Sequence, residues 1–235
     1  MLKIDLPDPI ARKTARLGLG RAGALPRTRA QRVFDADHAI TQDALAETVP
    51  PELLEELGLF SVDSAAPDRE TYLLHPDLGR RLSVAAIETL RAHITPGADV
   101  QIVVSDGLSA RAVTVNLPEL LPALRIALAE RGLRMGPPFF VRLGRVGLLN
   151  AVNAIADARV VVILVGERPG LGRADALSAY LGYRPQVDST DADREVICNI
   201  FPNGLPPREA ARRITEQIIA ILGAGVSGVT VRWRN

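Results

Sequence analysis

Short, almost entirely apolar runs separated by segments with helical spacing constrain this 235-residue chain more than any other feature. Such runs, with apolar side chains on both faces, are typical of strands in a parallel sheet that helices cover on both sides. The runs are Val100–Val104, Phe139–Leu143, Val160–Val165, Val196–Phe201 and Gly228–Trp233. Helical patterns at about 118–131, 148–158 and 207–222 indicate right-handed crossovers between strands. The pattern predicts an α/β fold, a Rossmann-like, mostly parallel sheet with helices on both faces.

The sequence before residue 98 lacks this alternation of strands and helices. Short helices are expected at 43–49 and 51–58, a polar loop at 61–69, and a longer helix at 82–94 that Pro96-Gly97 ends. We therefore divide the chain into residues 1–97, a small and mainly helical N-terminal region with a basic arm, and residues 98–235, the Rossmann-like domain.

The charges nearly balance, with 28 Lys and Arg against 27 Asp and Glu, but they are unevenly placed. Residues 1–34 carry eight basic side chains and two acidic ones, whereas residues 35–56 carry seven acids and no Lys or Arg. A basic arm can bind nucleic acid. Here no aromatic residue precedes Phe34, and the acidic segment would repel phosphates, so an arm that docks on a partner subunit is favoured.

The cellular setting follows from what the sequence lacks. We found no apolar run of about 20 residues, which a membrane-spanning helix needs, and the start of the chain lacks the apolar stretch of a signal peptide. A single cysteine, Cys198, excludes an internal disulfide framework. We expect a cytoplasmic protein with neither a membrane nor a nucleic acid as its partner.

Glycine and polar residues follow three of the predicted strands. They are Ser105-Asp106-Gly107, Gly144-Arg145-Val146 and Gly166-Glu167-Arg168-Pro169-Gly170. Ligands of open parallel sheets bind outside the carboxyl ends of the strands, so we expect a ligand at this edge; tight turns alone are the alternative. Glu167 could accept a hydrogen bond from an amide-rich ligand or act as a base, or it could pair with Arg168. For Asp106, capping of the following helix is favoured.

Signatures of catalysis are weak. Gly18–Gly23 matches GxGxxG in form, but no convincing strand precedes it. The three histidines share no metal-ligand spacing, and no motif ties Ser105, Ser109 or Cys198 to a histidine base. Within its apolar run, Cys198 is expected to be an inert buried thiol. The sequence predicts a binding protein with no catalytic residue and no metal ligands of its own.

Four blocks carry a family resemblance, and they lie in order from about residue 11 to residue 230. They are Arg16–Gly23 with Leu25-Pro26 and the helix containing His38; Val103–Ala110 with Ala112-Val113; Val165–Leu171; and Asp193-Arg194 through Cys198-Asn199-Ile200. Together they resemble the small (light) subunit of ethanolamine ammonia-lyase, an adenosylcobalamin-dependent enzyme. The sequence departs from the family after Val146, where the segment from Gly147 to Asn153 stands in place of an acidic residue and Ile-Gly. It departs again at Glu195-Val196, which replaces Asn-Cys or Thr-Cys.

The resemblance implies a function that composition could not reach. In that family a (β/α)8 large (heavy) subunit holds ethanolamine and the radical chemistry, and the small subunit covers the mouth of its barrel. The corrin lies between the two chains, and its own ring holds the cobalt. Contacts to adenosylcobalamin from this chain are then expected at Val146, Glu167 and Cys198.

By the same resemblance, the two subunits form a hetero-oligomer that converts ethanolamine to acetaldehyde and ammonia. The complex would lie free in the cytoplasm or inside a bacterial microcompartment. Two alternatives stay open at this stage. They are a stand-alone Rossmann-type enzyme acting on a small molecule, and a diverged, non-catalytic cobalamin-binding or scaffold homologue.

Overall fold

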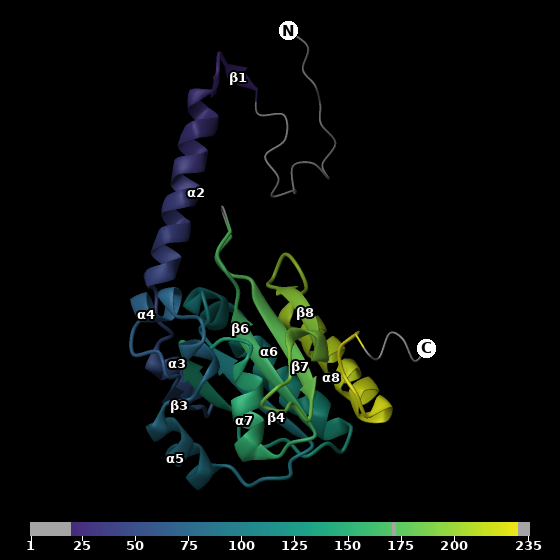
Figure 1. Ribbon diagram of the computed structural model, residues 1–235. Coiled ribbons are helices and arrows are strands. Elements are labelled where there is room, and N and C mark those ends of the chain that lie inside the picture. Colours follow the sequence, from purple (N-terminus) through teal and green to yellow (C-terminus); the bar gives the residue numbers. More distant parts are fainter. Residues whose placement is uncertain (1–19, 171–172, 230–235) are drawn as a thin grey trace.

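The computed structural model describes residues 20–170 and 173–229, which are built around one six-stranded sheet (Figure 1). Its order is β3-β5-β4-β6-β7-β8. The strands are β3 (Phe60–Asp63), β4 (Val100–Ser105), β5 (Phe139–Arg142), β6 (Val160–Gly166), β7 (Leu177–Tyr183) and β8 (Arg194–Ile200). The first four in sheet order run parallel, and the pairs β6–β7 and β7–β8 are antiparallel. The predicted class, an α/β fold with a mostly parallel sheet, is confirmed.

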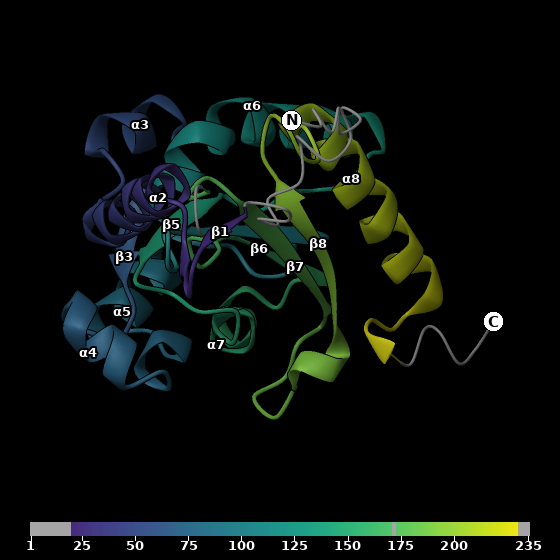
Figure 2. The same ribbon diagram turned by 90° about the horizontal axis from the view of Figure 1, so that it is seen from above.

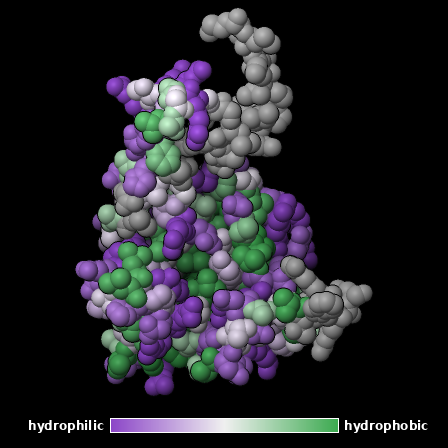
Figure 3. All heavy atoms as spheres, turned by 45° about the horizontal axis from the view of Figure 1, so that its top comes forward, coloured by the Kyte–Doolittle hydropathy of each residue, from purple (hydrophilic) through white to green (hydrophobic). Residues whose placement is uncertain are grey.

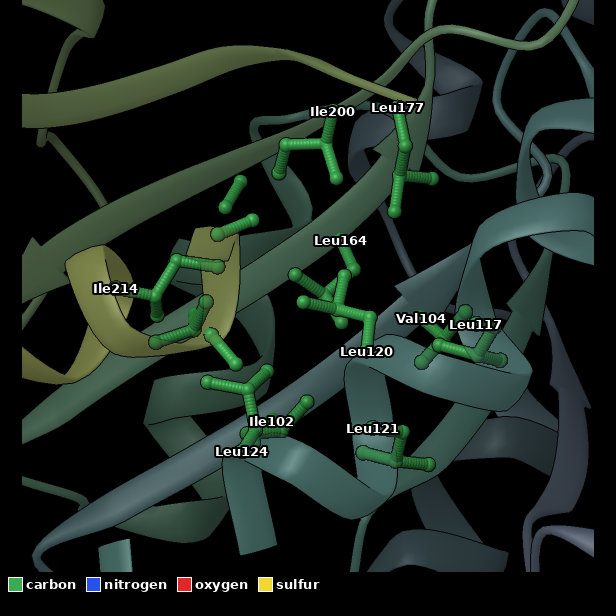
Figure 4. Packing of buried hydrophobic residues seen from close by; sticks show 14 of the residues in the cluster. Ile102, Val104, Leu117, Leu120, Leu121, Leu124, Leu164, Leu177, Ile200 and Ile214 are labelled. Atoms are coloured by element: carbon green, nitrogen blue, oxygen red, sulfur yellow. The ribbon is translucent and has the colours of Figure 1, made fainter. Parts of the chain in front are cut away.

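Helices α6 (Ala110–Glu130) and α8 (Pro207–Ala224) cover one face of this sheet. Leucines at helical spacing on α6 point toward β4 and β6, as Figure 4 shows for Leu117, Leu120 and Leu124. All three are fully buried. Burial of each contributes roughly 1.5–3 kcal/mol before the entropy of ordering is counted. This cluster anchors the central strands whose carboxyl ends carry the site.

Helices α5 (Val84–His93) and α7 (Leu148–Ala156) cover the opposite face, so helices lie on both sides of the sheet (Figure 2). Their buried residues pack against β5, β4 and β6. Beyond α7 this face is less covered, as the 51% exposure of Val196 on β8 shows. The outer, antiparallel part of the sheet therefore presents side chains to the surface beside the strand ends.

The part of the chain before residue 98 is not helical throughout. It contains the short ribbon β1 (Arg21–Ala22) and β2 (Leu25–Pro26), the strand β3, the helices α2 (Thr28–Ala46), α3 (Pro51–Glu56) and α4 (Arg69–Leu74), and the single turn η1 (Leu78–Arg80). Helix α2 extends away from the sheet (Figure 1). Strand β3 pairs with β5, so the sheet spans both sides of the boundary at residue 97. That division stays a prediction.

Two local predictions differ from the structure, and a third lies partly outside the described residues. The loop expected at 61–69 is wrong at its start, since β3 occupies 60–63; an edge strand needs only one inward side chain, here Val62. The helix expected from 118 begins at Ala110, because Ser109 caps it and two prolines are accommodated inside it. Of the strand expected at 228–233, residues from 230 onward lie outside the described part.

Helix α6 is also long and apolar enough to cross a membrane on length and composition alone, although the sequence contains no uninterrupted apolar run of about 20 residues. Nine of its residues are buried. They contact the sheet and α8, and this packing accounts for the apolar character of the helix.

Candidate functional site

A pocket of about 230 Å³ lies at the carboxyl ends of β4, β5 and β6. Val146 and Glu167, which the sequence placed after two different strands, both line it; we call it the Glu167 pocket. Its other lining residues are Tyr72, Arg80, Gly107, Leu108, Gly144, Arg145, Gly147, Val165, Gly166, Tyr180 and Asp191. Figure 3 turns this edge toward the viewer and shows apolar residues gathered in the middle of the face, with hydrophilic residues around them.

Glycines allow the loops after β4 and β6 to meet backbone to backbone. Gly107 has a φ of +54°, and a Cβ there would lie 2.5 Å from the carbonyl oxygen of Gly166. A Cβ on Gly166 would lie 2.1 Å from the oxygen of Ser109. Any side chain at either position would push the two loops apart. The glycines of these two blocks therefore set the position of Glu167 directly.

Tyr180 holds the carboxylate of Glu167. The hydroxyl of Tyr180, on β7, donates a hydrogen bond of 3.0 Å to Oε1 of Glu167. No ion pair joins Glu167 to its neighbour Arg168, so the pairing considered from the sequence is not formed. Burial, and secondarily the charge of Glu167, raises the pKa of Tyr180 to about 12. Tyr180 is therefore a protonated donor at neutral pH, and the second carboxylate oxygen of Glu167 can accept another hydrogen bond.

The prediction for Asp106 is wrong. Ser109 caps α6, because its hydroxyl accepts a hydrogen bond from the amide of Ala112. The buried carboxylate of Asp106 instead reaches the loop after β5 and accepts a 2.7 Å bond from the amide of Leu143. Burial raises the pKa of Asp106 despite this bond and the Arg69 guanidinium 3.9 Å away. Asp106 thus joins two strand-end loops below the pocket.

Tyr72 and Arg145, which also line the Glu167 pocket, hold each other in place. The Arg145 guanidinium lies 4.3 Å from the centre of the Tyr72 ring and donates to the Tyr72 carbonyl oxygen at 2.8 Å. The Tyr72 hydroxyl donates to the carbonyl of Gly144 at 3.2 Å. Stacking of this kind stabilises a cation over an aromatic face. Through these contacts α4 fixes the loop that carries Val146.

Cys198 differs from its sequence-based expectation. The thiol is exposed rather than buried. It lies on the edge strand β8, where no helix of the described residues covers the face that carries the exposed Val196. Its neighbour Val196 lies opposite Tyr180 in the β7–β8 register. An electrostatic interaction with Cys198 is one of the lesser causes that raise the pKa of Tyr180. It therefore lies near the site but does not line the Glu167 pocket.

Sequence reasoning missed Tyr180, Tyr72 and Arg80, three residues of the pocket wall. No local motif marks any of them, since each comes from an element remote in sequence from the strand-end loops. The assembled site offers a carboxylate with one oriented oxygen and the side chains of Arg80 and Arg145. Among the described residues no group of three or more His, Cys, Asp or Glu side chains could hold a metal ion.

These features suit a ligand that carries several hydrogen-bond donors and is held from one side. The pocket is smaller than the roughly 300–1,000 Å³ of pockets that enclose drug-sized ligands, so a larger ligand would leave much of its surface free for a second chain. The family model described as ethanolamine ammonia-lyase light chain matches residues 9–232. Because that match covers nearly the whole chain, the protein belongs to the ethanolamine ammonia-lyase light-chain family.

Proposed function

We propose that this light chain, paired with its heavy subunit, binds adenosylcobalamin at the Glu167 pocket and supports the deamination of ethanolamine to acetaldehyde and ammonia. Val146, Glu167 and Cys198 are the proposed cofactor contacts on this chain. The substrate and the reacting groups would lie in the barrel of the heavy subunit. The complex is expected in the cytoplasm, free or inside a microcompartment.

The observation that carries the proposal is the carboxylate of Glu167 held at a glycine-lined strand edge. Tyr180 occupies one of its oxygens, and the other has no hydrogen bond within the described part of the chain, so it can accept one from a ligand. The rim of the corrin carries propionamide and acetamide groups, whose N–H groups are suitable donors to a carboxylate. Gly107 and Gly166 are buried, and their carbonyl oxygens already accept hydrogen bonds from Arg69 and from the amide of Leu108. The acceptor that this edge offers to the amides of the cofactor's periphery is therefore the carboxylate of Glu167.

Cys198 and Val146 would contact the cofactor on either side of Glu167. Val146 is half-buried at the start of α7, where its side chain packs against the core and also lines the pocket. Cys198 lies on the edge strand two residues beyond Val196, which faces Tyr180 across the ladder. The exposed thiol of Cys198 and the exposed side chain of Val196 offer a mostly apolar surface to the flat ring of the corrin.

When bound, adenosylcobalamin supplies the organic radical with which the reaction begins. The residues of this chain would bind the cofactor, fix its orientation and keep water from the partner's barrel. Glu167, with its oxygen oriented by Tyr180, would hold one edge of the corrin. Protonated Tyr180 would contribute by positioning Glu167 and would transfer no proton.

Co-expression with the heavy subunit, followed by a spectral titration with adenosylcobalamin, tests the proposal. Glu167→Gln keeps the shape of the side chain and removes its charge, and should weaken cofactor binding by ~1–3 kcal/mol, about 5- to 150-fold in Kd. Glu130→Gln, an exposed carboxylate at the end of α6, is the matched control and should leave Kd unchanged.

Two results would count against the proposal in different ways. An unchanged Kd in Glu167→Gln removes Glu167 from the cofactor site. A complex that binds the cofactor normally but releases no acetaldehyde from ethanolamine keeps the binding role and contradicts the proposed reaction.

A further inference from the structure

A second pocket, of about 560 Å³, adjoins the Glu167 pocket. The two share Arg80, Gly147 and Asp191 in their linings, so they form one continuous depression. We call the second one the Arg80 pocket; its lining comes from η1, the start of α7 and the turn before β8. Its charged residues are Asp77, Arg80, Arg81, Asp191 and Arg194.

Among the charged side chains that line the Arg80 pocket, one cation has no anionic partner. Arg81 pairs with Asp77, and Arg194 pairs with Asp191. The side chain of Arg80 has no hydrogen bond or ion pair with any residue in the described part of the chain; its backbone amide donates to the carbonyl of Asp77. The lining therefore holds three guanidinium groups against two carboxylates, and both carboxylates are already paired. An anion entering the pocket would meet Arg80 as its free partner.

Arg194 adds a buried cation to the same wall. Its side chain is only 5% exposed and donates to Oδ1 of Asn150 at 3.2 Å and to the Ser189 carbonyl at 3.4 Å. Its buried Nε has no partner in the described structure. Burial lowers the pKa of Arg194; Asp191 opposes this effect, and the nearby charge of Arg80 adds to it. Two guanidinium groups close enough to repel each other are stabilised by an anion between them.

The start of α7 strengthens the positive potential at this place. Gly147 is the N-cap of α7 and supplies no side chain to cap it. A Cβ at this position would lie 2.9 Å from Cγ of Arg80, so glycine lets the arginine lie across the helix start. The N-terminus of a helix carries a partial positive charge. Arg80, Arg194 and α7 thus direct positive charge into one pocket.

We propose that the Arg80 pocket binds an oxyanion of the phosphate type, with Arg80 as its principal contact and Arg194 as the buried second cation. The inference rests on the proposed function, because the nucleotide tail of adenosylcobalamin carries one phosphodiester and the pocket adjoins the site proposed for its corrin. The single negative charge of a phosphodiester matches the single unpaired cation, and guanidinium is well suited to phosphate oxygens. A free phosphate anion has the same chemistry and is the other possible source.

The test compares two corrins in the complex with the heavy subunit: cobalamin, and cobinamide, which lacks the nucleotide tail and its phosphodiester. Arg80→Gln should weaken binding of cobalamin about tenfold more than binding of cobinamide, as loss of a charge-assisted contact to the phosphodiester does. Because Arg80 also lines the Glu167 pocket, cobinamide gives the baseline for any effect of the variant on the corrin itself. Glu167→Gln should weaken both corrins, because the corrin rim is common to them. Arg91→Gln removes the same charge from α5, away from both pockets, and should affect neither.

Inorganic phosphate separates the two sources. If the tail occupies the pocket, phosphate competes with cobalamin and not with cobinamide. If Arg80→Gln leaves both corrins unaffected, but phosphate raises the Tm of the wild-type complex and not that of the variant, the pocket takes a free anion and the anion site still stands.

Equal weakening of cobalamin and cobinamide by Arg80→Gln would overturn the inference, as would the absence of any effect of the variant on cobalamin and on phosphate. Either result leaves the proposed function standing as long as Glu167→Gln weakens both corrins. Failure of the proposed function appears separately, as wild-type binding in Glu167→Gln.

Discussion

Gly166 is a position at which one added methyl group should perturb the fold and the candidate site together. It ends β6, pairs with Leu177 of β7 and precedes Glu167 directly. A Cβ built there lies 2.1 Å from the oxygen of Ser109 and 2.4 Å from the oxygen of Asp106. Both contacts are backbone atoms of the loop after β4, so no flexible side chain can move aside. Gly166→Ala must therefore displace a strand end or a loop.

The size of the effect follows from the overlap. Contacts of a real Cβ shorter than 3.0 Å essentially never occur, so a displacement of close to one ångström is required. Overpacking a well-packed interior costs typically 1–3 kcal/mol, and two backbone contacts place Gly166→Ala at about 3 kcal/mol. For a chain of this length each kcal/mol lowers Tm by about 2–4 °C. We expect Tm to fall by about 6–12 °C.

Gly223 provides the matched control, because the same substitution should act there with the opposite sign. It is exposed in the last turn of α8, and a Cβ there would meet nothing within 4 Å. Alanine in a helix is favoured over glycine by roughly 0.5–1 kcal/mol. Gly223→Ala should raise Tm by about 1–4 °C.

Thermal unfolding of the full-length chain, followed by circular dichroism at one fixed concentration, measures both variants. Titration of each variant with adenosylcobalamin in the two-chain complex then reports on the site. Gly166→Ala should also weaken cofactor binding, because Glu167 moves with the strand end, whereas Gly223→Ala should not. A Tm for Gly166→Ala within 2 °C of wild type would refute the close backbone approach and, with it, the account of how Glu167 is positioned.

Two further predictions concern side chains around the site. Burial raises the pKa of both Tyr72 and Tyr180 from 10.0 to about 12. Since the folded state resists ionisation, the stability that these phenols contribute is complete below pH 10 and is lost as the pH rises through 12. A phenolate absorbance titration should therefore show two late-ionising tyrosines, and Tyr180→Phe should remove one; ionisation of both near pH 10 would contradict the burial argument. Ser109→Ala should cost about 2 kcal/mol, because it removes the cap of α6 and also the donor to a buried carbonyl, whereas Ser83→Ala, which removes only the cap of α5, should cost about 1 kcal/mol. Equal losses in urea denaturation would show that the buried carbonyl is satisfied in another way.

The elements of the fold could be predicted where the sequence repeats a pattern over several residues. Runs such as Val160–Val165 predict a buried strand because both faces of that strand meet helices. The edge strand β3 was missed, since one inward valine between polar neighbours looks like a loop. The start of α6 could not be predicted either. Pro118 is typical of the first turn of a helix, and nothing in the local sequence shows that this helix begins earlier, after the cap Ser109.

The candidate site could be predicted only in part. Glu167 and Val146 were found from their places after strands and from a family resemblance, and parallel strands bring such ends to one edge. The exposure of Cys198 could not be found this way. An apolar run looks the same whether its strand lies inside the sheet or at its edge, and the two differ only in which strand comes next to it.

Periodicity and short motifs are properties of neighbouring residues, so the class of the fold, the strand-end loops and the family can be predicted from the amino-acid sequence. The folded arrangement is needed to show that Tyr180 orients Glu167, that Asp106 ties two loops together, and that the charge of Arg80 lies near Arg194. These contacts join segments that are remote in the chain. Which segments meet depends on the strand order and on the packing of helices against both faces of the sheet, and no local pattern of residues records that order.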